Sequence, residues 1–181
     1  ASDASGTSLL DLGSRDWSYR LLEELQIDKS WMPPVSESQK IVGFITDEAS
    51  RLTGLRSDTP VVAGAGDQAA GAIGCGIADE SSVSINLGTS GVVFAGRMTP
   101  PHDPAGLLHG YCHAMAGTWH VMGVMLSAGG SLDWYRHALV GDRTFDRIVE
   151  EASTVQPGCE GLHFLPYLTG ERTPHAAPHA R

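Results

Sequence analysis

One stretch near the middle of the chain, residues 60–91, constrains the fold more than any other. It reads PVVAGAGDQAAGAIGCGIADESSVSINLGTSG. A short β-rich run at 60–63 stops at glycines, and Asp67 then begins a helix of small residues. A second strand at 83–87 leads into the glycine–hydroxyl turn 88–91. Because strands and helices alternate here, the stretch predicts an α/β protein.

The glycine–hydroxyl turn 88–91 has two interpretations. Glycines let backbone N–H groups approach phosphate oxygens closely, and Thr or Ser hydroxyls add further donors. It is not a Walker-type loop, because that motif needs a lysine after its last glycine and both lysines, Lys29 and Lys40, lie elsewhere in the sequence. Since residues 92–95 continue as a strand, a plain hairpin turn is favoured on the motif alone.

Asp67 also has two interpretations. A carboxylate at the end of a strand can take the proton of an attacking alcohol, whereas the structural alternative is a cap on the helix that follows. Gly64 and Gly66 tip the balance slightly towards a ligand site, because they let a ligand approach the backbone. The helix within 67–76 is thin, since it consists mostly of glycine and alanine, and this suits a contact between domains.

Composition excludes several classes of partner. The chain has 181 residues and a net charge of −9, so nucleic acid and anionic membranes are not expected as partners. No apolar run reaches transmembrane length, and no signal peptide is visible. The three cysteines form no CxxC pair and fit reduced thiols in a cytoplasmic protein. The histidine pairs His109/His113 and His175/His179 lack the accompanying ligands of a zinc site, so no metal site is predicted.

Hydrophobic periodicity and turn residues predict further elements before the central stretch. We expect strands at 7–12 and 41–45, and an amphipathic helix at 16–26. Thr46 is expected to cap a helix through Leu52, which Gly54 closes. The apolar side of the helix at 16–26 consists of Trp17, Leu21, Leu22 and Leu25.

The second half of the chain predicts strands at 109–115, 119–124 and 162–165, and helices at 127–139 and 144–152. The first of these helices opens with Ala-Gly-Gly-Ser at 128–131. Free N–H groups there would make a seat for an anion or nucleotide; the alternative is a closely packed joint between strand and helix. Leu132 and Trp134 are assigned to the core, and Glu171 with Arg172 is expected to form a surface ion pair.

Taken together, these stretches resemble the FGGY carbohydrate kinases, which have the actin/hexokinase/Hsp70-type ATPase (ribonuclease H-like) fold. Residues 60–76 and 84–95 resemble the centre of the family, and residues 120–136 and 164–181 resemble its xylulose kinase branch. Family members are much longer, with a first phosphate loop before this segment and adenosine contacts after it. The resemblance implies a fragment with an incomplete fold. Residues 1–78 are then the C-terminal part of the sugar-binding domain, and residues 79–181 the N-terminal part of the nucleotide-binding domain.

The resemblance assigns roles position by position. Asp67 matches the general base that acts on the sugar hydroxyl, and Gln68 matches the neighbouring substrate-binding residue. The positions that match nucleotide contacts are Gly88 and Thr89 in the second phosphate loop, and Gly129 and Asp133 at the start of the following helix. Gln68 departs from the xylulose kinase pattern, because Asn is usual there and Gln is familiar from glycerol kinases.

The implied activity is transfer of a phosphoryl group from ATP, bound with Mg²⁺, to a primary hydroxyl of D-xylulose, giving D-xylulose 5-phosphate. Glycerol, ribulose and gluconate are alternative substrates. A non-kinase ATPase like actin or Hsp70, or a non-catalytic sugar-binding module, are alternatives of other classes. The expected partners are therefore a small sugar and ATP, with a homodimer as one option for assembly.

Overall fold

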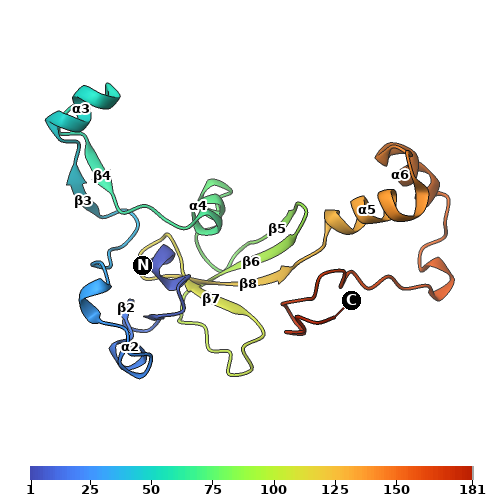
Figure 1. Ribbon diagram of the computed structural model, residues 1–181, viewed down its shortest axis with the longest axis horizontal. Helices are drawn as coiled ribbons and strands as arrows, with labels where there is room; N and C mark the ends of the chain where they lie inside the picture. The colour runs from blue at the N-terminus through green and yellow to red at the C-terminus, as the bar shows by residue number, and fades with distance from the viewer. Residues whose placement is uncertain (181) are drawn as a thin grey trace. The chain divides into compact units, whose positions relative to one another are not determined.

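The computed structural model describes residues 1–180 as a mixed α/β structure (Figure 1). Its residues fall into two compact units that interleave along the chain. The first unit comprises Ala1–Ser84 and Phe94–Met122, and the second comprises Ile85–Val93 and the residues from Gly123 onward. These compact units do not coincide with the predicted domains 1–78 and 79–181. The predicted domain boundary therefore stays a prediction.

The first unit begins with short elements around an apolar cluster. They are α1 (Ser2–Ser5), β1 (Leu10–Asp11), β2 (Asp16–Trp17), α2 (Tyr19–Glu24) and the 3₁₀ turn η1 (Lys29–Trp31). The predicted strand at 7–12 is reduced to β1, because α1 and the turn after it occupy the residues before Leu10. Side chains from these elements and from the later strands share one core, formed by Leu10, Trp17, Leu22, Cys112 and Trp119.

The helix predicted at 16–26 starts later than expected. Ser18 caps it by accepting a hydrogen bond from the Leu21 N–H, so the helix begins at Tyr19. The two residues before Ser18 pair instead with β1 as the antiparallel strand β2. Pairing of Trp17 with Leu10 is a tertiary contact that the helical periodicity did not reveal. Leu22 is buried as expected, whereas Leu25 is exposed.

The predictions for residues 41–63 are confirmed. The strands β3 (Ile41–Phe44) and β4 (Pro60–Val62) pair antiparallel, with α3 (Asp47–Thr53) between them. The Thr46 hydroxyl accepts from the Ala49 N–H at 3.1 Å, which caps α3 at its start. Gly54 ends the helix in the left-handed conformation with φ of 76°.

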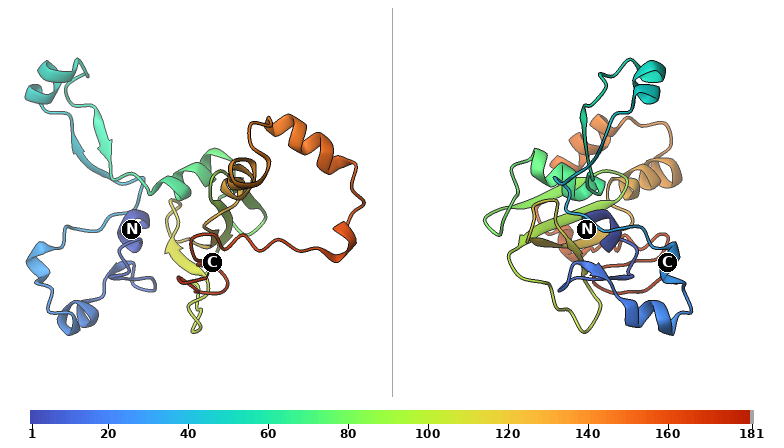
Figure 2. Two further views of the ribbon diagram at one scale, coloured as in Figure 1. Left: turned by 45° about the vertical axis from the view of Figure 1, so that its right-hand side comes forward. Right: turned by 90° about the vertical axis from the view of Figure 1, so that its left-hand side faces the viewer.

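The central stretch forms α4 (Asp67–Gly74), β5 (Val83–Leu87) and β6 (Gly91–Arg97), as predicted. A four-stranded sheet follows with the order β5-β6-β8-β7, where β7 is His109–Cys112 and β8 is Trp119–Met125. Its strands are the arrows coloured from green to light orange in Figure 2. β7 is shorter than the expected 109–115. The strands β7 and β8 pair antiparallel, which sets His109 opposite Met122 and Tyr111 opposite His120.

A second apolar cluster fixes α4 within the first unit. Ala72 of α4, Ile77 and Phe94 of β6 are buried together, and Met122 packs against them. Gly96 allows the loop after α4 to lie close to the sheet, because a Cβ there would come within 2.2 Å of the Asp79 carbonyl oxygen. Asp67, the first residue of α4, is thereby held at a defined place beside the sheet.

The second unit continues from β8 into helices. α5 (Gly129–Tyr135) passes into the π-helical turn η2 (Arg136–Val140), and α6 (Phe145–Ser153) precedes the 3₁₀ turn η3 (Cys159–Gly161). Thr144 caps α6, so the prediction of a helix from this residue is confirmed. None of the helices described for residues 1–180 has the length and apolar character needed to cross a bilayer.

The strand predicted at 162–165 is wrong, because this segment is irregular chain. A strand requires a neighbour to satisfy its backbone N–H and C=O groups, and no described strand pairs with these residues. Leu162 is 81% exposed and Leu165 is 66% exposed, so the apolar run that suggested a buried strand lies open.

Candidate active site

Asp67 lies at the first position of α4. The residue before it, Gly66, occupies the N-cap and offers no side chain, so Asp67 is not the N-cap residue itself. Its Oδ1 accepts from the Gln68 N–H at 2.7 Å, which still satisfies one free N–H of the first turn. The side chain is exposed. Both interpretations of Asp67 therefore remain compatible with its geometry.

A cavity of about 170 Å³ within the first unit is lined by Asp67 and Gln68. A space of this size suits part of a small molecule. The other walls come from α1 and its following turn, from the first residues of α4, and from β7 and β8. The remaining lining residues are Ser2, Asp3, Gly6, Gly66, Ala69, Tyr111, His120 and Met122.

His120 is a cavity residue that sequence reasoning missed. It is 3% exposed and stacks on Phe94 with ring centroids 4.4 Å apart. Its Nδ1 is buried and has no hydrogen-bond partner among the described residues. Burial, with a smaller effect of His113, lowers the pKa of His120 to about 3, so the ring is neutral at neutral pH. The useful sequence signal was a histidine inside the otherwise apolar run 119–125.

The turn 88–91 joins β5 to β6 in the second unit, as predicted. The Gly88 N–H donates to the Ser90 carbonyl at 2.9 Å. Within the described part of the second unit, the N–H groups of Thr89 and Ser90 make no hydrogen bond. They are the donors that a phosphate could use.

The start of α5 is not the free N–H seat that the glycine-rich sequence suggested. Ala128 and Gly130 donate to the Thr89 carbonyl at 2.8 and 3.1 Å, and Gly129 donates to the Gly88 carbonyl at 2.9 Å. A Cβ on Gly129 would lie 2.7 Å from the Gly88 oxygen, so glycine permits the close approach. The start of α5 is thus a closely packed joint with the turn, and nucleotide contact at Gly129 stays a prediction.

Asp133 lies on α5 with its side chain 52% exposed and 3.2 Å from Arg136 Nη2. Leu132 and Trp134 are not core residues as predicted, because they are 38% and 40% exposed. They line an apolar groove of about 560 Å³ on the second unit. Phe164 stacks on Trp134 there, at 5.9 Å between ring centroids.

Glu171 does not form the predicted surface ion pair with Arg172. It is 2% exposed, and its Oε1 accepts from the backbone N–H groups of Leu126 and Arg172 at 3.1 and 2.7 Å. A buried carboxylate needs hydrogen bonds. Here two backbone N–H groups supply them in place of the Arg172 guanidinium. Its Oε2 and the Thr173 hydroxyl are buried without a partner among the described residues.

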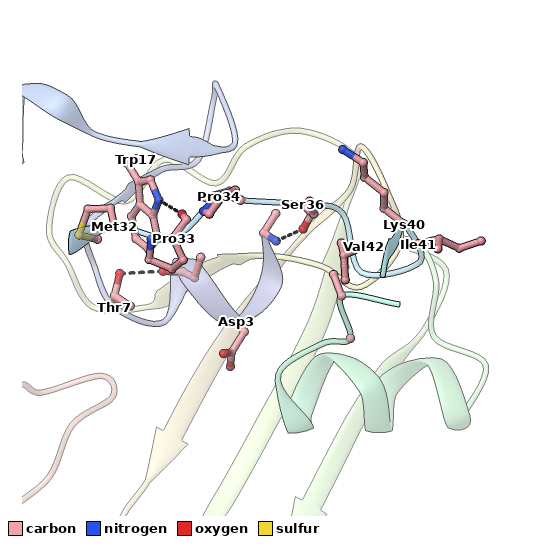
Figure 3. Close-up of a pocket in the computed structure, with 15 residues that line it drawn as sticks. Asp3, Thr7, Trp17, Met32, Pro33, Pro34, Ser36, Lys40, Ile41 and Val42 are labelled. Carbon is pink, nitrogen blue, oxygen red and sulfur yellow. Dashed lines mark hydrogen bonds between the residues drawn. The ribbon is translucent and has the colours of Figure 1, made fainter. Parts of the chain in front are cut away.

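A larger cavity in the first unit, about 910 Å³, has none of the predicted site residues in its lining (Figure 3). Its walls are mostly apolar and include Met32, Pro34 and Val42. The Trp17 Nε1–H donates to the Pro33 carbonyl at 2.7 Å along this wall. Within residues 1–180, no three His, Cys, Asp or Glu side chains gather in a way that could hold a metal ion.

Comparison with known families defines the class of protein. Residues 1–74 match the N-terminal domain of the FGGY family of carbohydrate kinases, and residues 83–181 match its C-terminal domain. The chain belongs to the FGGY family of carbohydrate kinases. The family has the actin/hexokinase-like ATPase fold, as the sequence predicted.

Among individual relatives, the xylulose kinase of Escherichia coli strain K12 is 41% identical over 180 residues, which cover 99% of this chain and 37% of that protein. A crystal structure of a xyloylose kinase from Brucella ovis aligns with a TM-score of 0.90 at 37% identity, covering 99% of this chain and 37% of that one. A gluconate kinase from Lactobacillus acidophilus aligns with a TM-score of 0.92 at 31% identity and the same coverage. The chain thus spans about 37% of the length of these relatives.

Proposed function

We propose that the protein carrying this chain transfers a phosphoryl group from ATP to a primary hydroxyl of D-xylulose. The observation that carries the proposal is the placement of Asp67 and Gln68 on one small cavity of a chain that belongs to the FGGY carbohydrate kinases. The similarity to proteins named xylulose kinase supports this sugar. We assign residues 1–78 to the sugar-binding domain and residues 79–181 to the nucleotide-binding domain.

Asp67 acts in this proposal as the general base. Its exposed carboxylate accepts the proton of the sugar hydroxyl as that oxygen attacks the γ-phosphorus, the bond from the γ-phosphorus to the bridging oxygen breaks and ADP leaves. Gln68 hydrogen-bonds the sugar beside it. The transition state of phosphoryl transfer is largely dissociative, so positioning and neutralisation of charge do most of the work. A base in such a site contributes roughly 10²- to 10⁴-fold to the rate.

The nucleotide side of the proposal rests on the turn 88–91. Gly88 has no side chain and so leaves room for a phosphate, and the unbonded N–H groups of Thr89 and Ser90, with the Thr89 hydroxyl, bind phosphate oxygens. Gly129 serves by letting α5 approach the turn, and Asp133 contacts the nucleotide further along the helix. Mg²⁺ bound with ATP would neutralise charge on the phosphates.

A second candidate is a kinase for another polyol of similar size. Two observations support this second candidate: Gln at position 68 and the alignment with a gluconate kinase. We expect a panel of D-xylulose, ribulose, gluconate and glycerol, with coupled detection of ADP, to give the highest kcat/KM for D-xylulose. A different leading substrate would replace the proposed one and leave the reaction class intact.

The role of Asp67 is tested by Asp67→Asn in a protein that contains this chain and is as long as its relatives, called the family-length protein below. Asn still accepts from the Gln68 N–H, so we expect an unchanged melting temperature and sugar affinity, with turnover lowered roughly 100-fold or more. Asp146→Asn is the matched control, because Asp146 also lies in the first turn of a helix but in α6. Activity of Asp67→Asn within a few-fold of the unmodified protein would leave Asp67 as a helix-capping residue only.

A further inference from the structure

Two histidines of the first unit, His113 and His120, lie side by side and differ in whether their ring nitrogens are hydrogen-bonded. His113 is fully buried, its Nε2 is 3.0 Å from the Ile77 carbonyl, and its Nδ1 accepts from the Ala114 N–H at 2.6 Å. Both of its ring nitrogens are therefore satisfied, as a structural histidine requires. Its neighbour His120 lies 5.6 Å away between ring centroids, and the buried Nδ1 of its ring has no hydrogen-bond partner among the described residues.

The ring of His120 is held rigidly in spite of this. Phe94 stacks on it at 4.4 Å, and Tyr111, its partner across the strand pair, lies 5.4 Å away. Its charged form is disfavoured by burial, so the imidazole keeps one N–H donor and one acceptor nitrogen at neutral pH. A buried polar group without partners costs free energy, and the fold retains it at the wall of the cavity that Asp67 and Gln68 also line.

We propose that His120 is a specificity-determining residue, which hydrogen-bonds an oxygen of the sugar bound in the Asp67 cavity. A neutral imidazole suits a polyol or ketose, because it can donate to a carbonyl or accept from a hydroxyl without introducing charge. A site that expects such an oxygen also discriminates against analogues that lack it, since its own polar group is then left unpaired. The inference rests on the proposed function, because it takes the ligand of this cavity to be a sugar.

The test uses His120→Phe in the family-length protein. Phenylalanine keeps the stacking on Phe94 and removes both ring nitrogens, so we expect the melting temperature to stay the same or rise. The KM for D-xylulose should rise about ten-fold, the KM for ATP should not change, and kcat should fall less than KM rises. A purely structural role would leave the KM for sugar unaltered.

The matched control is His109→Phe. His109, on β7, also has a buried ring nitrogen without a partner among the described residues, but it does not line the cavity. We expect His109→Phe to leave the KM for D-xylulose unchanged. An equal rise in both variants would overturn the proposal, because the effect would then follow from the strands and not from the cavity.

Monodeoxy analogues of D-xylulose give a second readout, which remains valid if His120→Phe folds poorly. With His120→Gln, the analogue that lacks the contacted oxygen should lose less affinity than it does with the unmodified protein, as measured by titration calorimetry. If every analogue loses the same affinity with His120→Gln as with the unmodified protein, the proposed contact is overturned and the kinase assignment stands. An unmodified protein that neither binds nor phosphorylates any sugar of the panel would overturn both.

Discussion

Buried polar side chains in this chain differ in whether their hydrogen bonds are made. The His113 ring is fully paired, Glu171 uses one oxygen on two backbone N–H groups, and His120 is unpaired among the described residues. Residue type alone did not separate these cases, because burial and partners come from β7, β8 and segments distant in sequence. Asp67 and Thr89 could be singled out from the sequence because glycines beside them mark their places locally.

The two buried histidines predict a pH dependence of folding stability. Burial lowers the pKa of both His113 and His120, the latter to about 3, relative to about 6.5 in an unfolded chain. The unfolded chain thus binds more protons below pH 6.5, so stability falls as the pH drops from 6.5 towards 3. We expect His120 to cost about 2 kcal/mol of folding stability between pH 7 and pH 5, and His113 to add to this loss.

Urea unfolding of the family-length protein at pH 7, 6 and 5 measures this dependence. Between pH 7 and pH 5, carboxylates with ordinary or lowered pKa values change little, so histidines dominate the change. His120→Phe should remove part of the loss, since it deletes one of the two titrating groups. A stability that is level over this range, or a slope that His120→Phe leaves untouched, would show that these rings accept protons in the folded state.

At the scale of elements, the accuracy of prediction follows the range of the interactions. Helices α3 and α6 begin at the capping threonines that the sequence marked, and β5 is bounded as expected at 83–87. The errors lie where a distant partner decides. Asp16 and Trp17 form a strand because β1 is there to pair with them, and 162–165 form none because no described strand lies beside them.

The joint between the turn 88–91 and α5 is another long-range feature. From sequence the glycines at 129 and 130 were open to two interpretations, and the carbonyls of Gly88 and Thr89 decide between them by taking the N–H groups of the helix start. The N–H groups that could bind a phosphate are therefore those of Thr89 and Ser90 in the turn and not those at the start of α5. Which of these residues contact a nucleotide stays a prediction.

This joint predicts a difference between two glycine substitutions. In Gly129→Ala the new Cβ would lie 2.7 Å from the Gly88 oxygen, so turn and helix must separate, at a cost of about 1–3 kcal/mol. We also expect weaker ATP binding, because the turn loses its support. Gly43→Ala in β3 is the control, since nothing lies within 4 Å of its Cβ and the change should gain up to about 1 kcal/mol. Equal unfolding midpoints for the two variants in urea would contradict the close contact.

At the scale of the whole chain, much apolar surface is left open. Leu52 is 80% exposed and Leu87 is 75% exposed, and every residue of β4 is exposed. A soluble monomer rarely leaves so many large apolar side chains uncovered. Composition did not reveal this property, because 41% hydrophobic residues is ordinary for a globular protein and says nothing about where they lie.

The open surface predicts the behaviour of residues 1–181 expressed alone. We expect this chain to self-associate as its concentration rises, because exposed strands and apolar faces favour contacts between copies. We also expect no phosphorylation of D-xylulose, since the resemblance places the first phosphate loop and the adenosine contacts of the family in other segments. Light scattering and coupled ADP detection, with the family-length protein as the positive control, measure the two properties. Turnover by the isolated chain above the rate of a matched Asp67→Asn preparation would mean that the cavity and the turn 88–91 suffice for transfer, and would remove the need for the other segments.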